Sequence, residues 1–282
     1  MRALIKHPAF RNPSVLIGGG LLLVLLLLAI AAPLLASADP AAIAPRFRLR
    51  APSEQFLMGT DGLGRDVFSR AMYGARVSLL VAACVAAIAL SVGLVIGLLA
   101  GYLRWLDGIV MRAMDGLMAI PGILLAIALV SLSGASLITV IVAIMVPEIP
   151  RVARLVRSVV LSIREEPYVE AAIGLGTPLR KILVQHVLPN TIAPLIVQGT
   201  YICASAMLTE AILSFLGAGL SSEVPTWGNI ISEGRAVFQR APWIIFFPGG
   251  LLAVTVLAIN ILGDGLRDTL DPRLQKRLGG VR

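Results

Sequence analysis

Few residues of this chain could do chemistry. It has two histidines and two cysteines, His7, His186, Cys84 and Cys203, and no stretch fits G-x-x-x-x-G-K-[ST], H-E-x-x-H, C-x-x-C or G-x-S-x-G. A phosphate loop, a zinc protease, a redox dithiol and a serine hydrolase each need one of these spacings. The sequence therefore predicts no catalytic residue, no metal site and no cofactor in this chain.

Two carboxylates stand out because they lie in apolar runs. Ionisable side chains in a membrane are costly and usually face a cavity or a partner. Glu210 is near the outer end of its run. It either lines a translocation path or outer gate, or makes a packing hydrogen bond or salt bridge. Glu148 is near the inner end of another run and is expected to be an interfacial anchor, paired with Arg151 or Arg154.

The longest insertion on the side expected to be cytoplasmic extends over residues 151–190. Aliphatic residues at helical spacing predict a first helix at 151–164. Pro167 suits the first turn of a new short helix, and a glycine, Gly174 or Gly176, is expected to end it after about two turns.

A third helix should follow, with Thr177 as its cap and Pro178 at its first position, until Pro189 stops it. On the short helix, Ala171 and Ala172 present almost no side chain, so another surface can come close. An isolated helix of about eight residues is unstable in water. The residues alone leave two hypotheses open: a helix that docks on a partner, or an amphipathic linker lying on lipid.

Long apolar runs position these residues. The chain has 282 residues, of which 57% are hydrophobic and 14% charged, against about 25% charged in soluble domains. The first run resembles a signal peptide, but its roughly 22 residues can span a bilayer, so a retained helix is expected. Six transmembrane helices are expected, at about 15–36, 77–101, 116–133, 136–150, 191–217 and 243–262.

Several details of this bundle follow from residue types. Pro121 should kink the third run, which forms a hairpin with the fourth. One face of the second run is nearly bare backbone, which predicts close packing, either within the chain or between subunits. That face carries Ala89, Gly93, Gly97 and Gly101. Three tryptophans suit the membrane interfaces: Trp105, Trp227 and Trp243.

An additional helix is expected outside the membrane at about 65–74. Thr60 and Asp61 should cap it, and Asp66 and Arg70 should form an i,i+4 ion pair. A surface helix without chemistry and a contact with a solute-binding protein are both open.

Charge predicts orientation and partners. With both termini in the cytoplasm, 16 of the 24 Lys and Arg lie on the cytoplasmic side, as the positive-inside rule requires. The net charge of +8 comes from residues that flank apolar runs. Anionic membrane lipid, and no nucleic acid, is therefore the expected partner of this charge.

Several motifs resemble one protein family. Glu170-Ala171-Ala172, then Gly176, then Leu188-Pro189 resembles the EAA loop of the permeases of binding-protein-dependent ABC importers. Other segments resemble the C-type permease of the dipeptide/oligopeptide/nickel branch: "MGTDGLGRDVFSRAMYGARVSL", "TEAILSFLGAGL", "PTWGNIISEGR" and "NILGDGLRDTLDPR". One departure is at residues 147–149, where relatives tend to have an aromatic residue.

The resemblance implies an all-α integral membrane protein with six transmembrane helices and the type I ABC importer permease fold. It implies three parts: 1–75, with the first helix and an extracytoplasmic loop; 76–266, the transmembrane domain with its coupling loop at about 151–190; and 267–282, a cytoplasmic tail. Glu170, Ala171, Ala172 and Gly176 would couple the chain to an ATPase.

The implied function is the non-catalytic, pore-forming subunit of an importer for di- or oligopeptides in the bacterial inner membrane. Its implied partners are a sister B-type permease, two ATPase subunits that bind ATP and Mg²⁺, and a solute-binding protein. A nickel-chelate or other small-solute importer is the alternative. From different classes, a secondary transporter would use Glu210 and Glu148 as coupling carboxylates, and a membrane enzyme would need a polar cluster that the sequence does not show.

Overall fold

A computed structural model describes residues 12–270, and this part of the chain is helical, without a β-strand. The expectations for the first residues and for most of the tail at 267–282 lie outside the described residues. The helices are α1 (Pro13–Ile30), α2 (Ala32–Leu35), α3 (Val67–Tyr102), α4 (Arg104–Ala119), α5 (Gly122–Ser133), α6 (Leu137–Arg164), α7 (Pro167–Gly174), α8 (Leu179–Ile182), α9 (Leu188–Phe215), α10 (Trp227–Gly234) and α11 (Trp243–Leu270).

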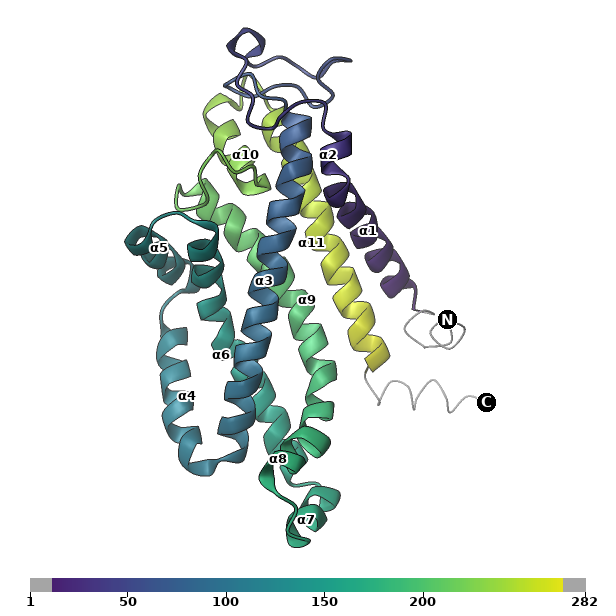
Figure 1. The fold of residues 1–282 in the computed structure, drawn as a ribbon, viewed down its shortest axis with the longest axis vertical. Helices are drawn as coiled ribbons and strands as arrows, with labels where there is room; N and C mark the ends of the chain where they lie inside the picture. The colour runs from purple at the N-terminus through teal and green to yellow at the C-terminus, as the bar shows by residue number, and fades with distance from the viewer. Residues whose placement is uncertain (1–11, 271–282) are drawn as a thin grey trace.

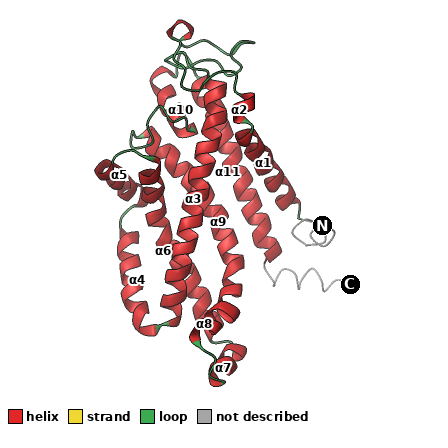
Figure 2. Ribbon diagram, in the orientation of Figure 1, coloured by secondary structure: helices red, strands yellow, loops and turns green. Residues whose placement is uncertain are grey.

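The long helices form one bundle (Figures 1 and 2). Helix α3 packs along α6 and α9, while α1 lies along α11 and also touches α3. The short helices lie at opposite ends of the bundle. We call the end that carries α7 and α8 the α7 end, and the end that carries α10 and the loop at 36–66 the α10 end (Figure 1).

Four helices of the described part are long and apolar enough to cross a membrane: α1, α3, α9 with its preceding turns, and α11. The pair α4 and α5 makes a fifth if its 85° bend is counted within one span. The chain is therefore an all-α protein with several membrane-spanning helices, as expected. The count of six stays a prediction, because α6 carries several charged residues in its second half.

Two expected breaks are confirmed. Pro121 separates α4 from α5, and the bend is much larger than a kink because the proline ends one helix at Ala119. The turn between α5 and α6 is short, and Gly134 adopts a left-handed backbone there (φ +80°). Beyond it, the fourth apolar run and the first helix of the polar insertion are one continuous helix, α6.

The bare face of α3 packs within the chain. A Cβ atom added to Gly93, Gly97 or Gly101 would lie 2.5–2.7 Å from a valine of α6. The valines are Val152, Val156 and Val160, one for each glycine in order. Because these contacts leave no room for a side chain, the intrachain interpretation of the glycine pattern is confirmed.

The separate helix expected at 65–74 is wrong. Helix α3 begins at Val67 and continues without interruption into the span, because no residue breaks it before Tyr102. Asp66, rather than Thr60 or Asp61, caps α3 by accepting a hydrogen bond from the Ser69 backbone N–H (2.9 Å).

The tryptophans lie in different environments. Trp227 is fully buried, and its indole N–H donates to the Ala71 carbonyl (2.9 Å). It therefore anchors α10 against α3 rather than facing a membrane interface, which corrects the expectation. Trp105 is exposed, whereas Trp243 donates to the Thr60 carbonyl (3.2 Å).

Candidate functional site

The polar insertion folds as a protruding unit at the α7 end. Helix α7 has Pro167 in its first turn and Glu170 near its positive end, as expected. Gly176 adopts φ +75°, which glycine reaches without steric cost. Thr177 does not cap the next helix. Its backbone N–H instead donates to the Ala172 carbonyl and closes α7.

The expectation that Pro189 stops the third helix is also wrong. A widened π-helical turn at Leu183–Val187 leads straight from α8 into α9, and Pro189 stands in the first turn of α9. Proline cannot donate a backbone hydrogen bond, and the widened turn accommodates it. The Asn190 amide donates to the His186 carbonyl (2.7 Å) and so satisfies one backbone acceptor there.

One buried residue attaches α7 to the bundle. Val169 is fully buried in the same core as Ile182 and Val187. Next to it, the Tyr168 and His186 rings lie 6.0 Å apart between centroids. Helix α7 is thus held in place by a small contact on one side.

The C-terminal end of α7 is exposed and apolar. Leu175 is 86% exposed and Ile173 is 45% exposed, and Ala171 is exposed beside them. The structure therefore brings Glu170, Ala171, Ala172 and Gly176 together on one protruding element. Ile173 and Leu175 were missed, although large apolar residues in a polar insertion were a signal for them.

Ion pairs join the C-terminal half of α6, which precedes α7 in the chain, to α4. Asp107 accepts from the Arg157 guanidinium (2.6 Å for Nη2 to Oδ2), and Asp115 accepts from Arg154 (2.5 Å). Movement of α7 and α6 is consequently linked to α4.

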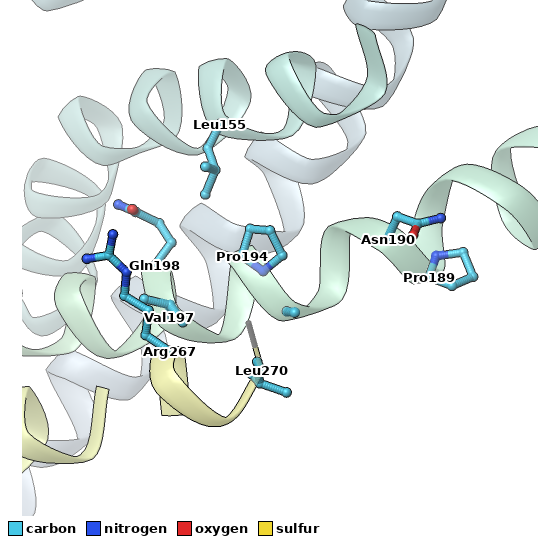
Figure 3. Close-up of a pocket in the computed structure, with 9 residues that line it drawn as sticks. Leu155, Pro189, Asn190, Pro194, Val197, Gln198, Arg267 and Leu270 are labelled. Atoms are coloured by element: carbon cyan, nitrogen blue, oxygen red, sulfur yellow. The ribbon is translucent and has the colours of Figure 1, made fainter. Parts of the chain in front are cut away.

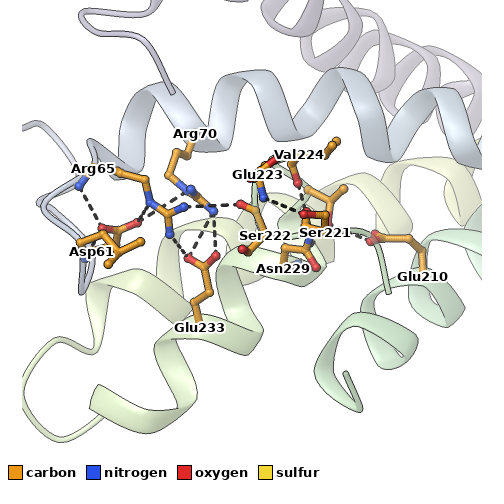
Figure 4. A network of polar contacts seen from close by, with 12 residues as sticks. Asp61, Arg65, Arg70, Glu210, Ser221, Ser222, Glu223, Val224, Asn229 and Glu233 are labelled. Atoms are coloured by element: carbon orange, nitrogen blue, oxygen red, sulfur yellow. Dashed lines mark hydrogen bonds and ion pairs between the residues drawn. The ribbon is translucent and has the colours of Figure 1, made fainter. Parts of the chain in front are cut away.

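An ion cluster lies at the α10 end (Figure 4). Arg65 contacts both Asp61 and Glu233 at 2.6 Å, and Arg70 contacts Glu233 at 3.1 Å. Both arginines and Asp61 are buried. Arg70 therefore does not form the expected pair with Asp66, and the cluster joins the 36–66 loop and α3 to α10.

Glu210 lies in a buried hydrogen-bond network beside this cluster (Figure 4). Its carboxylate accepts from the Thr226 hydroxyl (2.8 Å) and the Ser214 hydroxyl (2.9 Å). Thr226 also caps α10 through the Asn229 backbone N–H. This geometry matches the packing hydrogen bond considered for Glu210, and its role in a path or gate is untested.

Glu148 makes the expected pair with Arg151, at 2.8 Å between Oε1 and Nη1, whereas Arg154 pairs elsewhere. The same Oε1 is 3.4 Å from the Ser205 hydroxyl of α9. Within residues 12–270, the buried Oε2 atom has no hydrogen-bond partner. Glu148 is thus a buried carboxylate that is only half satisfied.

A pocket of about 660 Å³ opens between α6, α9 and α11 towards the α7 end (Figure 3). Its wall is mostly apolar, with a few polar groups. It is lined by Leu155, Pro189, Asn190, Ala193, Pro194, Val197, Gln198, Arg267 and Leu270.

Comparison with protein families gives two matches. Residues 93–276 match the family described as binding-protein-dependent transport system inner membrane component. Residues 8–52 match the N-terminal transmembrane domain of oligopeptide transport permease C.

Curated relatives cover nearly the whole chain. A probable peptide ABC transporter permease of Sinorhizobium fredii is 58% identical over 95% of this chain and 92% of its own length. A dipeptide transport system permease of Alkalihalophilus pseudofirmus is 43% identical over 94% of this chain and 88% of its own. A di/tripeptide transport system permease of Pseudomonas aeruginosa is 42% identical over 91% and 88%.

Proposed function

Because the chain belongs to the inner-membrane components of binding-protein-dependent transport systems, we propose that it is the C-type permease of an ATP-driven importer of di- or oligopeptides. The observation that carries this is the protruding α7 unit on a membrane bundle of this family. The peptide substrate rests on the names of three relatives that each cover over nine-tenths of this chain. Identifying the ligand that co-purifies with the cognate binding protein tests it, and a nickel chelate there would favour the alternative.

The proposed assembly supplies what this chain lacks. A sister B-type permease completes the pore, two ATPase subunits bind ATP and Mg²⁺, and an extracytoplasmic protein delivers the solute. The missing phosphate-loop sequence supports a non-catalytic subunit. Purifying the tagged chain from membranes should recover these partners, and a homodimer that transports without a sister permease would contradict the assembly.

We propose six crossings, namely α1, α3, the bent pair α4–α5, α6, α9 and α11, with both termini in the cytoplasm. The three parts expected from the sequence, 1–75, 76–266 and 267–282, remain as an outline of this topology. The α7 end then faces the cytoplasm and the α10 end faces outwards. Labelling of single cysteines at Ser222 from outside and at Gly176 from inside tests this, and labelling of position 176 from outside would contradict it.

Glu170, Ala171, Ala172 and Gly176 are proposed to dock α7 on an ATPase. The exposed apolar residues at the C-terminal end of α7 and its small attachment support this, because exposed apolar residues on a protruding element are typical of a protein–protein contact. Docking would transmit nucleotide hydrolysis through α7 to α6 and α9. Glu210 is proposed to hold the outer gate closed by joining α9 to α10.

The test of coupling is Gly176→Val in the complete complex in proteoliposomes. Valine at φ +75° is strained, so α7 should tilt and ATP-driven uptake should fall, with the complex still inserted. Ala172→Trp tests the contact by bulk. Gly174→Ala is the control, because Gly174 is helical and has open space around it among the described residues. If Gly176→Val and Ala172→Trp both keep the wild-type rates of uptake and of substrate-stimulated ATP hydrolysis, α7 is only a linker.

The same assay separates an importer from a secondary transporter. ATP inside the proteoliposomes, with the ATPase present, should drive uptake. Uptake driven by an ion gradient without ATP would support the secondary transporter, with Glu148 and Glu210 as coupling carboxylates.

A further inference from the structure

Glu148 and Glu210 are both buried acids in long helices, but of the two only Glu148 has a buried carboxylate oxygen without a hydrogen-bond partner in the described part of the chain. Glu210 accepts hydrogen bonds from two hydroxyl groups. Glu148 uses Oε1 for Arg151 and Ser205 and leaves Oε2 without a partner among the described residues. A buried carboxylate oxygen without a partner costs stability, and a ligand that donates a hydrogen bond to it would remove that cost.

Glu148 lies deep in the proposed membrane region. It is 11 residues from the first residue of α6, and Ser205 is 10 residues from the last residue of α9. At about 1.5 Å per residue, both lie roughly 15 Å from the helix ends at the α10 end, which is about half of a 30 Å bilayer core. Glu148 was expected near the inner end of an apolar run. That run continues past Glu148 as α6, so the carboxylate lies at mid-depth.

Arg151 is exposed at this depth. Its side chain is 44% exposed, and its guanidinium touches the Glu148 oxygen that faces Ser205 of α9. A half-exposed arginine is not stable against lipid tails, so this seam between α6 and α9 must face water, solute or protein.

The seam continues to the pocket at the α7 end. Leu155, one helical turn beyond Arg151, lines that pocket from α6. Val197 and Gln198, about two turns from Ser205, line it from α9, and Arg267 adds a charge from α11 (Figure 3). The seam between α6 and α9 thus leads from mid-depth to a pocket large enough for a small solute, and Gln198 and Arg267 are among the polar groups at that pocket.

We propose that Glu148 and Arg151 bind the charged termini of the peptide as it passes through the membrane. The free carboxylate oxygen of Glu148 accepts from the peptide ammonium group, and the exposed guanidinium of Arg151 donates to the peptide carboxylate. A zwitterion is complementary to this pair and can replace the bond between its two members. Because Oε2 is shielded from solvent here, binding requires the carboxylate to turn or the seam to widen. This inference rests on the proposed function.

The experiment measures uptake by the complete complex in proteoliposomes. The probes are trialanine, N-acetyl-trialanine and trialanine amide, each at a concentration that saturates the binding protein. For each probe, the rate of a variant is divided by the rate of the wild type, so that the preference of the binding protein cancels.

Glu148→Gln should lower trialanine uptake about tenfold but N-acetyl-trialanine uptake at most about twofold, because the capped peptide has no ammonium group. Arg151→Gln should show the matching pattern with the amide. Arg154→Gln is the control: its side chain is equally exposed (46%) but pairs with Asp115 of α4. It should change the rates of all three probes by the same factor.

If the complex with Glu148→Gln does not assemble, Glu148→Asp is tested instead. Aspartate retains the negative charge, but its side chain is shorter by one methylene group. It should lower only the uptake of peptides with a free ammonium group, by less than a full loss. Equal losses for free and capped peptides in any of these variants would overturn the inference and show a structural role or a contact with the sister permease. A wild-type complex that moves no peptide would overturn the proposed function itself.

Discussion

The two ends of this bundle hold their short helices in opposite ways. At the α10 end, α10 is fixed by buried charges, by the fully buried Trp227 and by the Glu210–Thr226 hydrogen bond. At the α7 end, α7 is held mainly through Val169 and exposes its remaining apolar residues. Helix α10 is thus packed by its own chain, whereas α7 keeps one exposed side.

This difference indicates where the molecule can move. Buried networks of charges and hydrogen bonds break as a unit, so the α10 end should resist local opening. A helix with few buried contacts belongs to the least stable part of a protein, and moving parts are drawn from there. Substitutions at the α10 end should therefore reduce stability, and those on the exposed side of α7 should reduce coupling at unchanged stability.

The largest loss of stability is expected from Arg70→Met. It leaves the Glu233 and Asp61 carboxylates with one arginine instead of two in a buried site, and breaking such a network costs about 3 kcal/mol or more. The melting temperature of the purified complex should fall clearly. Arg76→Met is the control, because Arg76 is exposed on the same helix. Equal melting temperatures of the two variants would contradict the proposed difference in stability between the α10 end and the α7 end.

Gly97→Val should come next. The new Cβ would lie 2.6 Å from the Val156 Cβ and 2.7 Å from the Ala153 carbonyl, so α3 and α6 must separate. Overpacking of this kind costs about 1–3 kcal/mol. Gly116→Val in α4 is the matched control, since the described residues leave open space there. The bundle should lose thermal stability only in the first variant, and no loss would mean that α3 and α6 can move apart without cost.

Thr226→Val should cost about 1–2 kcal/mol, because it removes both the α10 cap and a donor to Glu210. The control is Ser136→Ala, which removes the cap of α6 at an exposed position. Thermal melting of both variants should show the larger loss for Thr226. A larger loss for Ser136 would mean that the Glu210 network contributes little.

The sequence predicted local features well, because these depend on neighbouring residues. The bend at Pro121, the close packing of Gly97 and the short helix that begins at Pro167 all follow from single residue types. The family followed from motifs along the chain. Sequence could not predict that Arg70 prefers Glu233, 163 residues away, to Asp66 on the same helix, because that choice depends on how α10 packs.

The error at Pro189 has a cause outside the local sequence. Pro189 does not end its helix because a π-helical turn accommodates it, and the continuation depends on α9 packing in the bundle. The same limit applies to the acids. Their positions in the sequence made Glu210 the candidate for a path, but the hydrogen bonds of the folded chain leave Glu148 as the unsatisfied one.

The smallest effect on stability is expected from Leu175→Ser, which tests the uncovered side of α7. Leu175 is 86% exposed, so its replacement should change the free energy of unfolding by no more than about 0.5 kcal/mol. If an ATPase covers it, the same substitution removes about 1.5–3 kcal/mol of apolar burial from docking. That predicts a loss of ATPase affinity of at least about tenfold, measured by titrating the ATPase onto the permease in nanodiscs.

Leu34→Ser supplies the comparison for this last variant. Leu34 is 89% exposed but lies on α2, near the α10 end (Figure 1). It should leave ATPase affinity unchanged, because exposure alone does not make a docking surface. Equal ATPase affinities of the Leu175 variant and the wild type would mean that the exposed side of α7 is not the contact. In that case the two ends would differ only in stability, since a loosely held helix that binds no partner has no role in coupling.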